Sequence, residues 1–104
     1  MAKTKDKIIN IIKRLLIALE ENGINISEAY LFGSYSDGTS TKNSDIDIAL
    51  ISNEFTGILY IDIKKIGRIV RNIDYRIETH TFNNSDKDNS LFLQDIIKRG
   101  KKIA

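Results

Sequence analysis

The segment Ile46–Ile51 limits what this chain can fold into more than any other part of the sequence, because nearly every position in it is apolar. A strand that is apolar on both sides is buried on both faces, which happens when helices cover the two faces of a sheet. Apolar residues also recur at helical spacing over 8–19 and over 58–70, on either side of this segment. The sequence therefore predicts an α/β (α+β) fold, in which helices pack on a small mixed β-sheet.

The other elements follow from changes in the hydrophobic pattern. We expect a first helix capped by Thr4 and ending at Gly23, a strand over 29–32, a loop with room for one helical turn over 34–44, a strand over 73–82, a loop over 83–90 and a last helix over 91–100. The strand over 73–82 alternates strictly, so Asp74, Glu78 and His80 are predicted to share its polar face. One strand of the sheet is thus expected to present a row of polar side chains.

Length and composition limit the function further. The 104 residues suit one domain over 1–104, and 41% hydrophobic with 29% charged residues is a globular balance. No apolar run is long enough to cross a bilayer, so a soluble, cytoplasmic protein without a membrane partner is expected. A net charge of +2 gives little reason to expect nucleic acid as a direct partner. With no cysteine and one histidine, a bound metal is expected to be a hard cation held by oxygens.

A glycine-serine bend and a pair of aspartates stand at the ends of two predicted neighbouring strands. Asp45 and Asp47 are two residues apart, so on a strand their carboxylates point to the same side and repel each other. A hard divalent cation such as Mg²⁺ relieves that repulsion and also binds phosphate oxygens. Gly33 lacks a Cβ and lets a phosphate come close to the backbone, while Ser34 offers an N–H and a hydroxyl as donors. These features predict adjoining metal and phosphate sites.

This pattern resembles the signature of the DNA polymerase β-type nucleotidyltransferases, and in particular of the minimal nucleotidyltransferase (MNT) proteins. It is carried by Leu31-Phe32-Gly33-Ser34-Tyr35-Ser36-Asp37-Gly38 followed by Ser44-Asp45-Ile46-Asp47-Ile48. The resemblance implies a nucleotidyltransferase fold, two Mg²⁺ ions, and ATP or another NTP as substrate. It also implies that Gly33, Ser34 and Ser44 bind the nucleotide and that Asp45 and Asp47 are catalytic metal ligands.

The family further implies a third carboxylate on a later strand, for which Glu78 and Asp74 are the candidates. They are four residues apart, roughly 13 Å at strand rise, so only one of them joins the same cluster. Glu78 is the expected catalytic metal ligand, because the segment from Ile77 to Phe82 resembles the strand on which minimal family members carry the acid. No role is expected for His80, since a lone histidine on a strand is more often structural.

By resemblance, the chain transfers AMP from ATP to a side-chain hydroxyl of a HEPN-type ribonuclease toxin, and so is the antitoxin of a HEPN/MNT pair. Two alternatives stay open. Where family members often carry a basic residue, this chain has Asp37, and the added negative charge favours a catalytically weak antitoxin that neutralises its partner by binding alone. An RNA-binding accessory module would instead use the basic residues Lys98, Arg99, Lys101 and Lys102. Lys42, in the loop before the aspartates, is a candidate phosphate contact.

Overall fold

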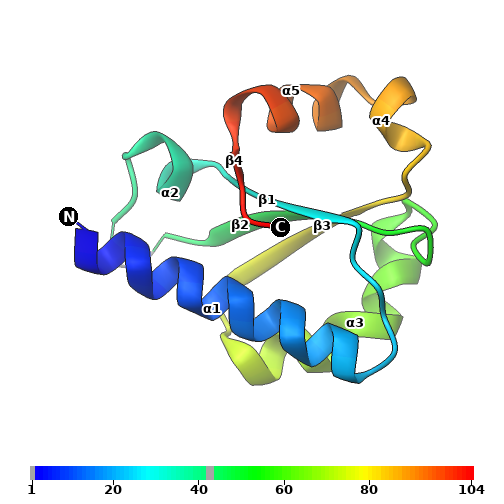
Figure 1. The fold of residues 1–104 in the computed structure, drawn as a ribbon, viewed down its shortest axis with the longest axis horizontal. Coiled ribbons are helices and arrows are strands. Elements are labelled where there is room, and N and C mark those ends of the chain that lie inside the picture. The colour runs from blue at the N-terminus through cyan, green and yellow to red at the C-terminus, as the bar shows by residue number, and fades with distance from the viewer. Residues whose placement is uncertain (1, 42–43) are drawn as a thin grey trace.

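The computed structural model describes residues 2–41 and 44–104. Its elements are α1 (Ala2–Glu21), β1 (Glu28–Phe32), α2 (Ser34–Asp37), β2 (Ile46–Ile51), α3 (Leu59–Ile73), β3 (Ile77–Phe82), α4 (Asp86–Asn89), α5 (Leu91–Arg99) and β4 (Lys101–Lys102). The strands form one mixed sheet in the order β3-β2-β1-β4, with β2 parallel to β3 and antiparallel to β1. Helices α1 and α3 cover one face, and α5 covers the other (Figure 1). The predicted fold class is confirmed.

Among the described residues, no helix combines the length and apolarity that crossing a membrane requires.

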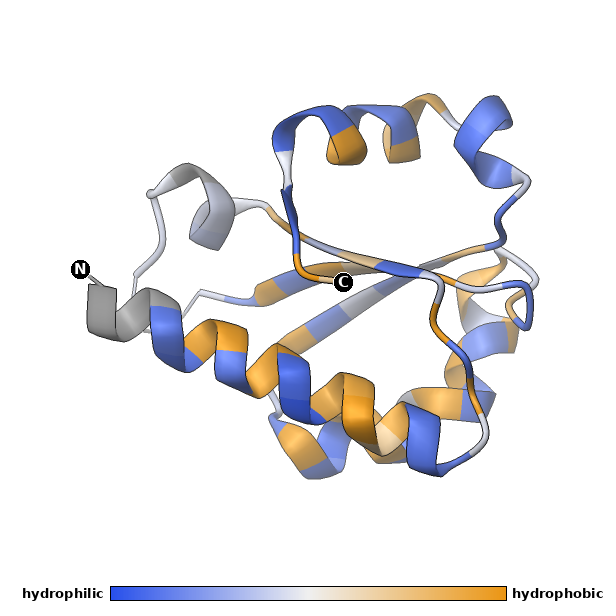
Figure 2. Cartoon of the chain, in the orientation of Figure 1, coloured by the Kyte–Doolittle hydropathy of each residue, from blue (hydrophilic) through white to orange (hydrophobic). Residues whose placement is uncertain are grey.

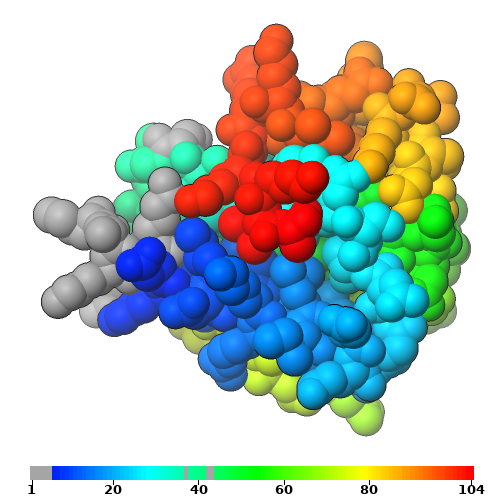
Figure 3. Space-filling model, viewed as in Figure 1, coloured from blue at the N-terminus to red at the C-terminus, as the bar shows by residue number. Residues whose placement is uncertain are grey.

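Burial of β2 on both faces confirms what its apolar run predicts. Ile46, Ile48 and Leu50 lie in the larger core cluster with side chains of α1 and α3, while Ala49 and Ile51 lie in a smaller cluster with α5. The apolar parts of α5 face the sheet in Figure 2. In Figure 3 the C-terminal residues, in red, fill the surface between α1 and α5. The two faces of the sheet therefore carry separate cores, and the smaller one leaves part of its face available for a site.

Helix α1 ends near the predicted residue but starts earlier than predicted. The N–H of Gly23 donates to the carbonyl of Glu20 (3.0 Å) and that of Ile24 to the carbonyl of Leu19 (2.9 Å), with Gly23 at φ 82°. This is the glycine-closed helix end that the sequence indicates. At the other end the helix already includes Ala2, so the predicted cap at Thr4 is wrong. Ala2 and Lys3 are good helix formers, and they extend the helix past Thr4.

Strand β3 starts at Ile77 and not at the predicted Ile73, because α3 continues through Ile73. The N–H of Asp74 still donates to the carbonyl of Val70 (3.2 Å). The Asp74 carboxylate then accepts hydrogen bonds from the backbone N–H (2.8 Å) and the guanidinium (3.1 Å) of Arg76. The alternation over 73–77 thus spans a helix end and a turn, so Asp74 does not share a strand face with Glu78.

A buried carboxylate holds the segment between β2 and α3. Asp62, in the first turn of α3, is 1% exposed and accepts hydrogen bonds from the N–H of Thr56 (2.8 Å), the N–H of Gly57 (3.1 Å) and the hydroxyl of Thr81 on β3 (2.7 Å). Burial by itself raises the pKa of Asp62, but these hydrogen bonds outweigh it and hold the pKa below its ordinary value of 3.8. The ionised carboxylate therefore fastens the start of α3 to the sheet.

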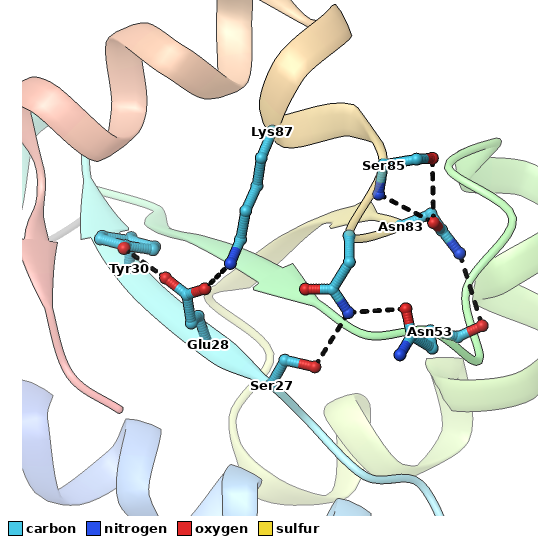
Figure 4. A network of polar contacts seen from close by, with 8 residues as sticks. Ser27, Glu28, Tyr30, Asn53, Asn83, Ser85 and Lys87 are labelled. Carbon is cyan, nitrogen blue, oxygen red and sulfur yellow. Dashed lines mark hydrogen bonds and ion pairs between the residues drawn. The ribbon is translucent and has the colours of Figure 1, made fainter.

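A polar network fastens α4 to the sheet on the opposite face (Figure 4). Glu28 of β1 forms an ion pair with Lys87 of α4. Asn84 donates to the hydroxyl of Ser27 (3.1 Å) and to the side-chain oxygen of Asn53 (2.7 Å). The predicted loop over 83–90 thus contains a short helix that is tied to β1. Because α5 follows α4 directly, this network also fixes where α5 begins over the sheet.

Candidate active site

The candidate site lies on the α5 side of the sheet, where β1 ends and where β2 and β3 begin (Figure 1). Asp47 is opposite Phe32 in the antiparallel β1–β2 pairing and opposite Glu78 in the parallel β2–β3 pairing. The bend at Gly33 follows directly after Phe32. The register of the sheet therefore brings Gly33, Asp47 and Glu78 together from separate parts of the chain.

Three side chains converge at this point: Asp47, Glu78 and His80. Their ligating atoms all lie within 4.8 Å of one another. Glu78 and His80 are two residues apart on β3, so they project from the same face. Asp45 precedes β2, is exposed, and lies outside this group of three. Two carboxylates and an imidazole at this spacing are a ligand set that fits a divalent cation.

The imidazole of His80 is held by aromatic neighbours and lacks a hydrogen bond at one nitrogen. Its ring makes edge contacts with Phe32 (centroids 5.0 Å apart) and with Phe92 of α5 (5.9 Å). Nε2 is buried without a hydrogen-bond partner and lies 3.7 Å from Oδ1 of Asp47, which is too long for a hydrogen bond. An unsatisfied buried polar atom costs about 1–3 kcal/mol. The site therefore contains a buried nitrogen, Nε2 of His80, that lies beside a carboxylate and has no hydrogen-bond partner.

Burial and two neighbouring charged groups together set the pKa of Asp47. Burial raises the pKa of Asp47 above its ordinary 3.8, the nearby His80 opposes that rise, and the carboxylate of Asp45 adds to it. Asp45 is thus close enough to repel Asp47, as the two-residue spacing predicts, although it is not in the group of three. A cation between these carboxylates would remove both the repulsion and the cost of burying Asp47 in its charged form.

Gly33 sits directly against Asp47 in a conformation that other residues rarely adopt. Its φ of 75° and ψ of −152° lie in a region used almost only by glycine. A Cβ on Gly33 would come within 2.5 Å of Oδ2 of Asp47. The bend is therefore glycine for two reasons, since both the backbone angles and the carboxylate exclude a side chain. The predicted nearness of the bend to Asp47 is correct.

The other predicted residues occupy different positions around the bend. Ser34 is half-buried at the start of α2. The hydroxyl of Ser44 accepts a hydrogen bond from the N–H of Thr41 (2.8 Å), so it closes the loop before β2. Asp37 is the last residue of α2, and Lys42 lies outside the described residues. Of the two candidate third carboxylates, Glu78 lies beside Asp47, and Asp74 is bound to Arg76 instead.

A groove of about 300 Å³ lies next to the bend. It is lined on one side by Phe32, Gly33 and Ser36, and on the other by residues of α5 that include Phe92, Asp95 and Arg99. Within α5, Nε of Arg99 pairs with Oδ1 of Asp95 at 2.9 Å. The groove therefore combines an aromatic wall with charged groups and opens directly onto the backbone of Gly33.

Comparison with known protein families decides what kind of protein carries this arrangement. The family model described as "Polymerase beta, Nucleotidyltransferase" matches residues 6–104. The chain belongs to this nucleotidyltransferase family. Its nucleotidyltransferase fold also matches a proposed nucleotidyltransferase from Sulfolobus solfataricus, with a TM-score of 0.68, 19% identity, and coverage of 84% of this chain and 77% of the other. At that identity the likeness concerns the fold alone.

The chain is also similar to a protein adenylyltransferase and to two toxin–antitoxin structures. The protein adenylyltransferase MntA of Shewanella oneidensis is 46% identical over 39 residues, which are 38% of this chain and 28% of MntA. The match thus spans less than a third of that relative. A toxin–antitoxin structure with AMP-PNP has a TM-score of 0.63 at 29% identity, covering 92% of this chain and 72% of the other. An MntA–HpeT mutant, in which two aspartates two positions apart are replaced by glutamate, has a TM-score of 0.58 at 26% identity, covering 96% and 72%.

His80 is the residue that sequence reasoning missed. The alternation of β3 predicts that it shares a face with Glu78, and this is correct, but a lone histidine carries no signal of its own. The signal that would have found it is the parallel pairing of β2 with β3, which sets Glu78 opposite Asp47 and His80 opposite Ala49. Only that register shows that the histidine reaches the carboxylates.

Proposed function

We propose that this chain is a divalent-cation-dependent adenylyltransferase that transfers AMP from ATP to a hydroxyl of a partner protein. The observation that carries the proposal is the convergence of Asp47, Glu78 and His80 within 4.8 Å, beside the Gly33 bend. Membership of the nucleotidyltransferase family supports the type of reaction. The likeness to a toxin–antitoxin structure with AMP-PNP supports an adenine nucleotide as substrate. The chain would act as a single minimal nucleotidyltransferase domain over 1–104.

Each part of the site has a role in this reaction. The triphosphate would lie against the backbone of Gly33, which has no Cβ, and beside the N–H and hydroxyl of Ser34. Asp47 and Glu78 would hold Mg²⁺, and the exposed carboxylate of Asp45 would serve as a further ligand for two ions. When bound, the cations would supply positive charge that lowers the pKa of the acceptor hydroxyl and stabilises the leaving pyrophosphate.

The transfer exchanges a phosphoanhydride bond of ATP for a phosphoester bond to the acceptor. The acceptor oxygen forms a bond to the α-phosphorus of ATP while the bond from that phosphorus to the pyrophosphate oxygen breaks. The hydroxyl proton passes to a carboxylate of the cluster, and pyrophosphate leaves. The groove beside Gly33 receives the nucleoside part of ATP, with the ring of Phe92 forming part of its wall.

The acceptor in this proposal is a HEPN-type toxin, and the chain is its cytoplasmic antitoxin. The similarity to MntA, a protein adenylyltransferase, supports a protein as acceptor. The similarity to the MntA–HpeT pair supports a toxin as that protein. The aspartates replaced in the MntA–HpeT mutant have the same spacing as Asp45 and Asp47, which supports a role for such a pair in these relatives.

Transfer of label from α-labelled ATP tests the proposal. The chain is incubated with Mg²⁺, labelled ATP and the protein encoded by the neighbouring gene, and the label on protein is counted. Asp47→Asn and Glu78→Gln are expected to slow labelling by at least about 10- to 100-fold, since loss of even an indirect metal contact has effects of that size. Asp74→Asn is the matched control, because this carboxylate lies outside the cluster. Undiminished labelling by Asp47→Asn would refute the proposal.

A binding-only antitoxin is the second candidate function. It is favoured by the position of Asp45 outside the group of three, together with the acidic Asp37 at the end of α2. In that case no label would reach the partner, yet the wild-type chain and Asp47→Asn would neutralise the toxin equally well. The same incubation, followed by an assay of toxin activity, separates the two functions.

A further inference from the structure

We propose that Nε2 of His80 is a direct ligand of the cation held by Asp47 and Glu78, so that this site prefers a first-row transition cation such as Mn²⁺ to Mg²⁺. The inference rests on the proposed function, since the cation is the one that nucleotidyl transfer needs. It departs from the sequence-based expectation of a metal held by oxygens alone.

The separation between His80 and Asp47 is slightly longer than that of two ligands of one ion. Nε2 and Oδ1 are 3.7 Å apart, beyond hydrogen-bond range. Two atoms that each lie about 2.1 Å from a common cation are about 3.0 Å apart at a right angle and about 3.4 Å apart at a tetrahedral angle. With the Glu78 oxygen included, all three atoms lie within 4.8 Å of one another. Side-chain shifts that shorten these separations by at most about 1.4 Å would bring the three atoms onto one ion.

The surroundings of His80 leave its Nε2 beside Asp47 without a hydrogen bond. That atom is buried and has no hydrogen-bond partner. The ring packs against Phe32 and Phe92, with interplanar angles of 66° and 73°. A histidine whose role was packing alone would not need a nitrogen directed at two carboxylates. Held in this way, the imidazole is already oriented for coordination before a cation binds.

The nature of the three ligands decides which cation fits. Mg²⁺ prefers oxygen ligands and retains water, whereas an imidazole nitrogen strengthens the binding of first-row transition ions. The set of Asp47, Glu78 and His80 combines two hard ligands with one of intermediate softness. Such a set accepts Mg²⁺ through its carboxylates but gains affinity from His80 only with a transition ion.

Calorimetric titration of the chain with Mn²⁺ alone and with Mg²⁺ alone tests the preference. We expect the wild-type chain to bind Mn²⁺ at least about 10-fold more tightly than Mg²⁺. His80→Phe keeps an aromatic ring against Phe32 and Phe92 but has no ligating nitrogen. It is expected to weaken Mn²⁺ binding by at least about 10-fold and to leave Mg²⁺ binding unchanged.

Electron spin-echo spectroscopy of bound Mn²⁺ gives a direct readout of the ligand. The wild-type chain should show modulation from an imidazole nitrogen, and His80→Phe should not. His80→Gln serves as a second variant if the phenylalanine chain does not fold, and thermal melting without metal compares the folded states. A wild-type Mn²⁺ spectrum without nitrogen modulation would overturn the inference.

The outcomes also separate this inference from the proposed function. If Mn²⁺ and Mg²⁺ bind equally, are both weakened by Glu78→Gln, and are both unaffected by His80→Phe, the carboxylate site stands and the role of His80 is refuted. If neither cation binds the wild-type chain, with or without AMP-PNP, both proposals fail. Asp74→Asn, which lies outside the cluster, should bind both cations as the wild type does.

Discussion

Replacement of Gly33 by alanine is the perturbation that tests most closely how the bend and the carboxylates are joined. The added Cβ would lie 2.5 Å from Oδ2 and 3.3 Å from Cγ of Asp47. The backbone of Gly33, at φ 75° and ψ −152°, is also unfavourable for alanine. The substitution therefore combines backbone strain with a steric clash at the proposed metal ligand.

The two costs are estimated separately. A non-glycine residue in this region of backbone angles costs about 1–3 kcal/mol. Inserting a methyl group into a filled space costs about 1–3 kcal/mol more, reduced here because the Asp47 carboxylate is able to swing aside. We expect Gly33→Ala to lower the free energy of unfolding by about 2–4 kcal/mol. By displacing Asp47, it should also weaken cation binding.

Urea unfolding in the presence of a chelator measures the effect, and Gly23→Ala is the matched control. Gly23 has a similar φ of 82°, but nothing lies within 4 Å of its added Cβ, so that change should cost only about 1–2 kcal/mol of backbone strain. In an Asp47→Ala background the clash is absent, and Gly33→Ala should then cost about as little as the control. Equal effects of Gly33→Ala with and without Asp47, measured as a double-mutant cycle, would refute the reasoning.

Two further predictions concern the contacts that hold the framework of the site. Asp62→Asn should lower the free energy of unfolding by about 1–3 kcal/mol at neutral pH, because it disrupts hydrogen bonds to a buried anion. Since the folded-state pKa of Asp62 lies below 3.8, its contribution is present above that value and is lost as the pH falls through the folded-state pKa. Urea unfolding across this range should thus show wild type and variant converging in acid, and a constant difference would contradict the account. Lys87→Met should cost less than about 1 kcal/mol, as the ion pair with Glu28 is partly exposed. It should nevertheless speed hydrogen exchange in α4 and early α5, and unchanged exchange there would show that the network does not fix these helices.

The helices and strands that were predicted correctly are those in which the pattern of apolar residues shows directly which faces are buried. β2 had to be central because nearly every position is apolar, and α1 and α3 each carry one apolar stripe. The errors lie where the structure is set by side-chain hydrogen bonds or backbone pairing and not by the apolar pattern. Ile73 fits a strand alternation but is the last residue of α3, because the turn is set by Asp74 and Arg76. β4 consists of Lys101 and Lys102, which pair through the backbone with Tyr30 and Leu31 and leave no hydrophobic pattern to detect.

The sequence predicted a cluster of carboxylates beside the glycine bend. It did not predict the full set of side chains that form the cluster in the structure. Strand alternation relates Asp45 to Asp47, yet Asp45 precedes β2 and its exposed carboxylate lies outside the group of three. The closeness of Asp47 to Glu78 and His80 depends on the parallel register between β2 and β3. Register is fixed by packing across the whole sheet, so a single strand does not reveal it.

The most direct test of the site is a crystal structure of this chain with Mn²⁺ and AMP-PNP, analysed by anomalous scattering. The account predicts an anomalous peak in direct contact with the carboxylates of Asp47 and Glu78, with the triphosphate against the backbone of Gly33 and Ser34. A nucleotide bound elsewhere, or a Mn²⁺ ion that does not touch Asp47, would contradict it.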